Sequence, residues 1–131
     1  MKFKLKPNEA RAALIKALRS GEYKQCQGRL HNTIDNTYCC LGVATDLFCK
    51  LEFPLDFKNN NYGYGCFIHN GLRETTALLP IVQDWLGFKD DCGCFNSDIA
   101  HSPSLMGMND SGKTFNEIAD VLEVPPPGML Q

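Results

Sequence analysis

The chain has 131 residues, of which 44% are hydrophobic, and its 13 basic and 15 acidic residues leave a formal charge of −2. A chain of this size buries about two-thirds of its unfolded surface in one domain, without needing disulfides or metal. The balanced charge excludes a general electrostatic attraction to nucleic acid or membrane, and no apolar run reaches the roughly 18 residues of a membrane span.

Seven cysteines are an odd number, and the first residues, MKFKLK, lack the apolar core of a secretion signal. We therefore expect reduced thiols in a cytoplasmic protein, most of them packed as small hydrophobic side chains. The sequence gives no reason to expect a cofactor.

In the first half of the chain, apolar residues at helical spacing predict helices over residues 8–20 and 40–50. Gly21 is expected to end the first helix in the left-handed conformation. Between the two helices, the loop at residues 32–36 predicts a hairpin. Since Cys39 and Cys40 are adjacent where the chain enters the second helix, we expect at most one of them to face the core.

In the second half, Asn59 to Asn61 predict the turn of a second hairpin. Pro80 and Gly87 bracket a short helix over residues 80–86, and residues 89–104 are expected to form a loop. Thr114 and Glu117 have the spacing of a capping box, which predicts a helix over residues 115–123.

These elements predict an α+β fold, with three main helices packed on a small antiparallel sheet of hairpins. We expect one domain over residues 1–131. Residues 1–6 and 124–131 are expected to be loose ends.

Cys39 and Cys40 are the first candidates for chemistry, because a thiol at a helix N-terminus can have a depressed pKa and act as a nucleophile. His31, His69 and His101 are available as bases, but none has a recognisable catalytic context. A cysteine-dependent hydrolase is therefore kept as an alternative to a binding protein.

Metal and DNA binding are disfavoured. Cys92 and Cys94 are separated by one residue, which is closer than structural zinc pairs usually are, and no second pair completes four ligands. Residues 112–128 resemble the opening helix of a helix-turn-helix, yet Pro125 stands where the second helix would begin. We expect neither a metal site nor DNA binding.

A polar cluster after the first helix is the favoured binding site. Its cations, phenol and amide can bind phosphate through several donors and stack on a base or sugar, and two polar residues near the C-terminus could complete it. The predicted ligand-binding residues are Arg19, Tyr23, Lys24, Gln25, Arg29, Asn109 and Asp110. Helix-end cations and turn residues also occur without any ligand, so this remains a hypothesis.

Four blocks resemble a group of small phage-encoded proteins of unassigned function: ALRSGEYKQ at 17–25, YCCLGV at 38–43, Leu-Pro followed by W-L-G at 79–87, and MNDSGKTFNEIADVLE at 108–123. The resemblance implies a phage product in the cytosol of an infected bacterium. Proteins of that setting include sponges that capture nucleotide messengers of bacterial immunity, such as the cyclic oligonucleotides of CBASS and the cyclic ADP-ribose isomers of Thoeris.

We therefore expect a homo-oligomeric, non-catalytic protein that sequesters a small anionic nucleotide. Two alternatives remain open at this point. One is the cysteine-dependent hydrolase, and the other is an inhibitor that binds a host protein.

Overall fold

The computed structural model describes residues 2–96 and 103–131. The chain forms a single compact α+β domain. Its helices are α1 (Pro7–Arg19), α2 (Cys40–Leu51), α3 (Pro80–Leu86), α4 (Leu105–Asp110) and α5 (Phe115–Glu123), and its strands are β1 (His31–Asn32), β2 (Thr37–Tyr38), β3 (Asp56–Asn59), β4 (Gly65–His69) and β5 (Leu72–Glu74).

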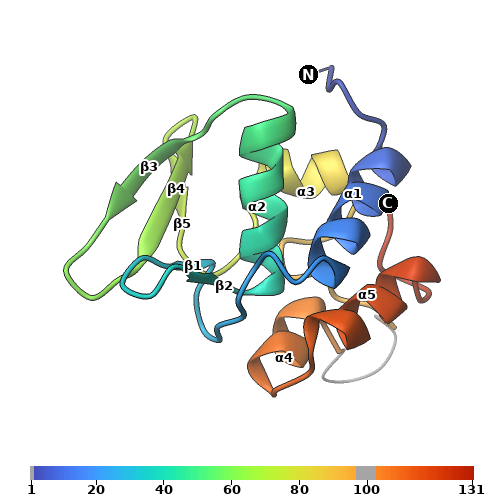
Figure 1. The fold of residues 1–131 in the computed structure, drawn as a ribbon. Coiled ribbons are helices and arrows are strands. Elements are labelled where there is room, and N and C mark those ends of the chain that lie inside the picture. The colour runs from blue at the N-terminus through green and yellow to red at the C-terminus, as the bar shows by residue number, and fades with distance from the viewer. Residues whose placement is uncertain (1, 97–102) are drawn as a thin grey trace.

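Helix α2 stands at the centre of the molecule (Figure 1), with the three-stranded sheet on one side and α1 and α3 on the other. That sheet has the antiparallel order β3-β4-β5, and β1 and β2 form a separate two-stranded hairpin. Phe48 of α2 packs edge-on against Trp85 of α3, with ring centroids 5.4 Å apart, and both side chains are fully buried. The core therefore lies around α2, as the amphipathic pattern predicted.

The ends of the helices confirm the start and stop signals in the sequence. Thr114 and Glu117 form the capping box of α5, with the Thr114 hydroxyl accepting from the Glu117 N–H at 3.1 Å. Pro80 occupies the first turn of α3, and Gly87 ends that helix with a φ of 71°. Gly21 follows α1 with a φ of 76°, a conformation that costs glycine little.

Among the described residues there are five helices and two sheets, so the prediction of three main helices on one sheet was incomplete. Helix α4 and strand β5 were both missed. Each is too short to show a hydrophobic period, since α4 has six residues and β5 has three. Helix α4 is capped by the Ser104 hydroxyl, which accepts from the Gly107 N–H at 2.9 Å.

The prediction that at most one of the adjacent thiols faces inward was wrong. Cys39 is 3% exposed and Cys40 is 1% exposed. The first turns of α2 are buried on every side, because Leu30 and α4 cover the faces that the apolar stripe leaves open. Cys39 is the N-cap residue, and its sulfur accepts from the Gly42 N–H at 3.4 Å.

Both ends of the chain, expected to be loose, make contacts. The backbone N–H groups of Lys4 and Leu5 donate to the Glu52 carboxylate at 2.7 and 3.0 Å. Met129 is fully buried, and its carbonyl accepts from the Lys89 N–H at 2.9 Å. Part of the predicted loop at 89–104 lies outside the described residues. Across the described ranges, no helix has the length and apolar character needed to cross a bilayer.

Candidate functional site

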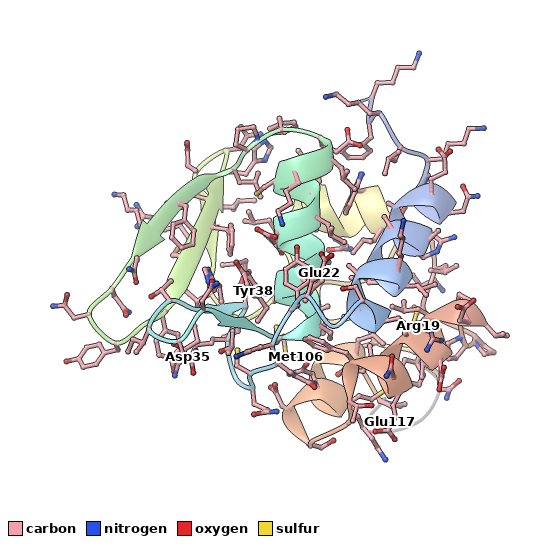
Figure 2. All side chains as sticks on the ribbon, in the orientation of Figure 1. Arg19, Glu22, Asp35, Tyr38, Met106 and Glu117 are labelled. Carbon is pink, nitrogen blue, oxygen red and sulfur yellow. The ribbon has the colours of Figure 1, made fainter. Side chains whose placement is uncertain are left out.

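A polar pocket of about 530 Å³ opens between the segment after α1, the β1–β2 turn and the exposed face of α2. The residues that line this polar pocket are Glu22, Tyr23, Lys24, Asp35, Asn36, Tyr38, Asp46 and Lys50. Its volume falls in the range of small-molecule sites. In Figure 2, Asp35 and Tyr38 lie on the side of the β1–β2 hairpin, and Glu22 lies beside α2 on the side of α1.

Backbone pairing explains why residues so far apart in sequence meet here. The segment after α1 runs beside β2, with the Tyr38 N–H donating to the Lys24 carbonyl and the Cys26 N–H donating to the Tyr38 carbonyl, both at 2.9 Å. This pairing places Tyr23 and Lys24 next to Tyr38. Asp35 lies in the turn of the same hairpin, where its carboxylate accepts from the Thr37 hydroxyl at 2.7 Å.

The wall on the α2 side is a hydrogen-bonded group of three side chains. The Tyr23 hydroxyl donates to Asp46 Oδ2 at 2.5 Å, and Lys50 Nζ lies 3.0 Å from the same oxygen and 3.1 Å from the Tyr23 hydroxyl. Asp46 and Lys50 are one helical turn apart, a spacing that lets such a pair meet. The group fixes Tyr23 against α2 and neutralises the Asp46 carboxylate.

The surroundings of Tyr23, Tyr38 and Lys50 raise the pKa of all three side chains. Burial, together with the hydrogen bond to Asp46, raises the pKa of Tyr23 to about 12. The hydrogen bonds to Asp46 and to Tyr23 raise the pKa of Lys50. Burial also raises the pKa of Tyr38. At neutral pH the phenols are therefore neutral donors, and Lys50 is a cation.

An apolar hollow of about 240 Å³ adjoins the polar pocket and shares Tyr38 and Asp46 with it. Its other lining residues are His31, Cys49, Pro54, Leu55, Phe57 and Phe67. The His31 ring stacks on Tyr38 with centroids 4.1 Å apart and planes inclined by 6°. The Tyr38 ring thus separates a charged compartment from an aromatic one.

The two compartments together suit a ligand with a flat ring and a polar, hydroxyl-bearing part. Lys24 and Lys50 provide the amines of the polar pocket, and Glu22, Asp35 and Asp46 provide carboxylates. Amines bind phosphate oxygens and carboxylates accept from hydroxyls. Because Asp46 already bonds Tyr23 and Lys50, the remaining ionic groups are Lys24, Glu22 and Asp35.

Two arginines predicted to bind ligand point away from the polar pocket. Arg19 forms an ion pair with Asp120 of α5 at 2.7 Å, and Figure 2 shows it on the α5 side of the molecule. The Arg29 guanidinium lies 3.8 Å above the centre of the Tyr64 ring and donates to the Tyr62 carbonyl at 3.0 Å. Arg29 therefore belongs to the tip of the β3–β4 hairpin.

Three further predicted residues tie the loop after α1 to α4. The Asn109 carboxamide oxygen accepts from the Cys40 N–H at 3.0 Å and from Gln25 Nε2 at 2.9 Å, and its nitrogen donates to the Cys26 carbonyl at 2.7 Å. Asp110 accepts from the Gly28 N–H at 2.9 Å. Asn109 is fully buried, so this amide holds the loop in place from inside the protein.

The seven predicted ligand-binding residues are thus divided among separate places, and two of them, Tyr23 and Lys24, line the polar pocket. Sequence reasoning missed its other six lining residues. One signal was available for two of them, because Asp46 and Lys50 have the i,i+4 spacing of an ion pair on the polar face of a predicted helix. Asp35 and Asn36 are residue types typical of turns, so they gave no sign of a binding site.

The thiols do not have the character of nucleophiles. Burial raises the pKa of Cys39 to about 12 and raises that of Cys40 well above its usual value. A helix N-terminus normally lowers a thiol pKa, but here the loss of solvent outweighs it. Within residues 2–96 and 103–131, no three His, Cys, Asp or Glu side chains are grouped to hold a metal ion; His101 lies outside these ranges.

Comparison with known families matches residues 6–125 to a family described as a domain of unknown function, DUF8296. The chain belongs to this family. The matched region runs from the N-cap of α1 past the end of α5, and it includes every residue that lines the polar pocket. Neither the curated proteins nor the solved structures contain a match to this chain.

Proposed function

We propose that the protein binds a small nucleotide messenger in the polar pocket and holds it without cleaving it. The observation that supports this proposal is the junction of two compartments at Tyr38: a pocket with amines and carboxylates beside a hollow lined by aromatic rings. A nucleotide has a base that suits the hollow, ribose hydroxyls that suit the carboxylates, and a phosphate that suits Lys24.

The role we infer is that of a phage counter-defence sponge acting in the host cytosol. Its support is the resemblance of four sequence blocks to small phage proteins, together with a preformed pocket whose walls are held by hydrogen bonds. Capture of a messenger requires a preorganised site more than a reactive group. Because Lys50 is already paired with Asp46 and Lys24 is the remaining amine of the pocket, messengers with few phosphates, such as cyclic dinucleotides or cyclic ADP-ribose isomers, fit better than larger oligonucleotides.

The absence of cleavage is part of the proposal, and it rests on the state of the thiols. Cys39 and Cys40 are buried, with raised pKa values. A cysteine hydrolase needs an accessible thiolate near neutral pH. Binding without cleavage therefore agrees better with the buried thiols than hydrolysis does.

Calorimetric titration with a panel of cyclic dinucleotides and cyclic ADP-ribose isomers tests the proposal. We expect one ligand class to bind and to be recovered intact after the protein is denatured. Lys24→Ala should weaken binding at least about tenfold, because it removes a charge-assisted contact. Arg19→Ala is the matched control, since Arg19 is outside the pocket. This variant should bind the nucleotide with the same affinity as the wild type.

Three results would overturn the proposal. Recovery of a cleaved nucleotide would favour the hydrolase. Failure of the whole panel to bind, combined with capture of one host protein that Lys24→Ala does not affect, would favour a protein inhibitor. Equal losses in Lys24→Ala and Arg19→Ala would place the ligand elsewhere.

A further inference from the structure

Strand β3 forms one edge of the three-stranded sheet (Figure 1), and all four of its residues are exposed. In the described part of the chain, β4 is the one strand that pairs with it. An open edge presents backbone N–H and C=O groups that can pair with another strand.

The register shows which backbone groups face outward. The Asn60 N–H donates to the Tyr64 carbonyl at 3.3 Å, and this pair continues the register in which Lys58 opposes Cys66. Hydrogen-bonded pairs alternate along an antiparallel ladder. Asp56 and Lys58 therefore bond toward β4, while the backbone groups of Phe57 and Asn59 point away from it.

We propose that two copies of the chain associate by antiparallel pairing of β3 with β3, about a two-fold axis at Phe57. In this register the two Phe57 residues exchange two backbone hydrogen bonds. Asp56 of each copy then lies opposite Lys58 of the other, and both side chains are on the same face of the strand. The edge is thus complementary in charge to itself, which is what an isologous two-fold contact requires.

The apolar face of β3 supports the same partner. The Phe57 side chain is 44% exposed, although its ring already packs 5.0 Å from Phe67 and 6.0 Å from His31, measured between centroids. In the proposed pairing, Phe57 of the second copy lies directly beside it and covers the exposed part. Because Phe57 lines the apolar hollow, each copy contributes an aromatic ring to the mouth of the other copy's hollow.

Sedimentation velocity over about 10–500 µM protein, the range expected for a small interface, tests this proposal with charge exchanges. We expect the wild type to dimerise within this range. Asp56→Lys and Lys58→Asp should each be monomeric, because like charges then oppose one another. An equimolar mixture of the two variants should form heterodimers, and the double exchange Asp56→Lys/Lys58→Asp should restore the homodimer.

Arg73→Glu is the matched control, because Arg73 is exposed on β5 at the other edge of the same sheet; this variant should dimerise like the wild type. Circular dichroism should show the same fold in every variant, since the exchanged side chains are exposed. A wild type that stays monomeric at about 500 µM would overturn the proposal and indicate that Lys58 protects the edge from pairing. So would single variants that dimerise normally, or a mixture that stays monomeric.

Discussion

At the scale of single residues, the largest difference between sequence and structure concerns Asn109. Its sequence context, Asn-Asp-Ser-Gly, suggests a turn on the surface, and we predicted a ligand contact. The carboxamide is instead fully buried and joins α2, α4 and the loop after α1. This role of Asn109 could not be predicted from the sequence, because its hydrogen-bond partners Cys40 and Cys26 are 69 and 83 residues away along the chain.

Asn109→Ala should lower the free energy of unfolding by about 2–3 kcal/mol, because it leaves the buried Cys40 N–H and Cys26 carbonyl without partners. Urea denaturation measures the change. Asn8→Ala, at an exposed position of α1, is the control and should change stability by less than about 0.5 kcal/mol. Equal effects of the two substitutions would contradict the role given to Asn109.

The buried thiols should make the protein sensitive to alkali. Since burial raises the pKa of Cys39 to about 12, the folded state keeps the proton that the unfolded chain loses near pH 9. Below about pH 8.5, Cys39 makes its whole contribution to the free energy of unfolding. Above that pH the contribution falls by about 1.4 kcal/mol per pH unit, until the thiol of the folded protein also ionises.

Cys39→Ser tests this pH dependence, because serine keeps an N-cap acceptor and does not ionise. The decline in the free energy of unfolding between about pH 9 and pH 11 should be shallower in Cys39→Ser than in the wild type. Parallel curves for the two proteins would show that Cys39 ionises equally in both states.

At the scale of elements, sequence patterns located the long helices well and the short elements poorly. Helices α1, α2, α3 and α5 begin or end at capping residues, prolines or glycines that act locally. Helix α4 depends on contacts with distant segments, whereas β5 pairs with the adjacent β4 across the two-residue turn Asn70-Gly71, a local hairpin signal that the prediction overlooked. The Cys92 carbonyl, for example, accepts from the Met106 N–H of α4 at 3.2 Å, a contact that leaves no periodic signal in the sequence.

The position of α2 depends on a close approach at Gly42. A Cβ atom added there would lie 1.7 Å from the Leu30 carbonyl oxygen, which belongs to the backbone and cannot move alone. A glycine within a helical pattern often marks such an approach, so the sequence contained this signal. The approach sets how near α2 lies to the backbone of Leu30, the residue before β1.

Gly42→Ala should destabilise the protein by about 3 kcal/mol or more, because the helix and the Leu30 backbone must separate. Gly107→Ala is the matched helical control. A Cβ atom there would meet the Ser104 hydroxyl at 3.1 Å, and we expect a change within about 1 kcal/mol. Thermal and urea unfolding measure both, and a well-tolerated Gly42→Ala would refute the close packing.

At the scale of the whole molecule, the binding site is assembled by the fold. The predicted site combined residues 19–29 with Asn109 and Asp110, whereas the polar pocket combines the chain after α1 with the β1–β2 turn and α2, which meet because the chain after α1 pairs with β2. Tyr23 and Lys24 could be predicted, since they lie in that chain segment. The proximity of Asp35 to Asp46 could not be predicted, because it depends on how the hairpin meets α2.

A titration followed through backbone amide resonances shows whether the ligand binds in the polar pocket. The nucleotide that binds best in calorimetry is added to isotope-labelled protein. We expect the largest shifts at Lys24, Asp35, Tyr38 and Asp46, with little change at Arg19 or Asp110. Shifts concentrated at Arg19, Arg29 or Asp110, with Asp35 and Asp46 unaffected, would contradict binding in the polar pocket.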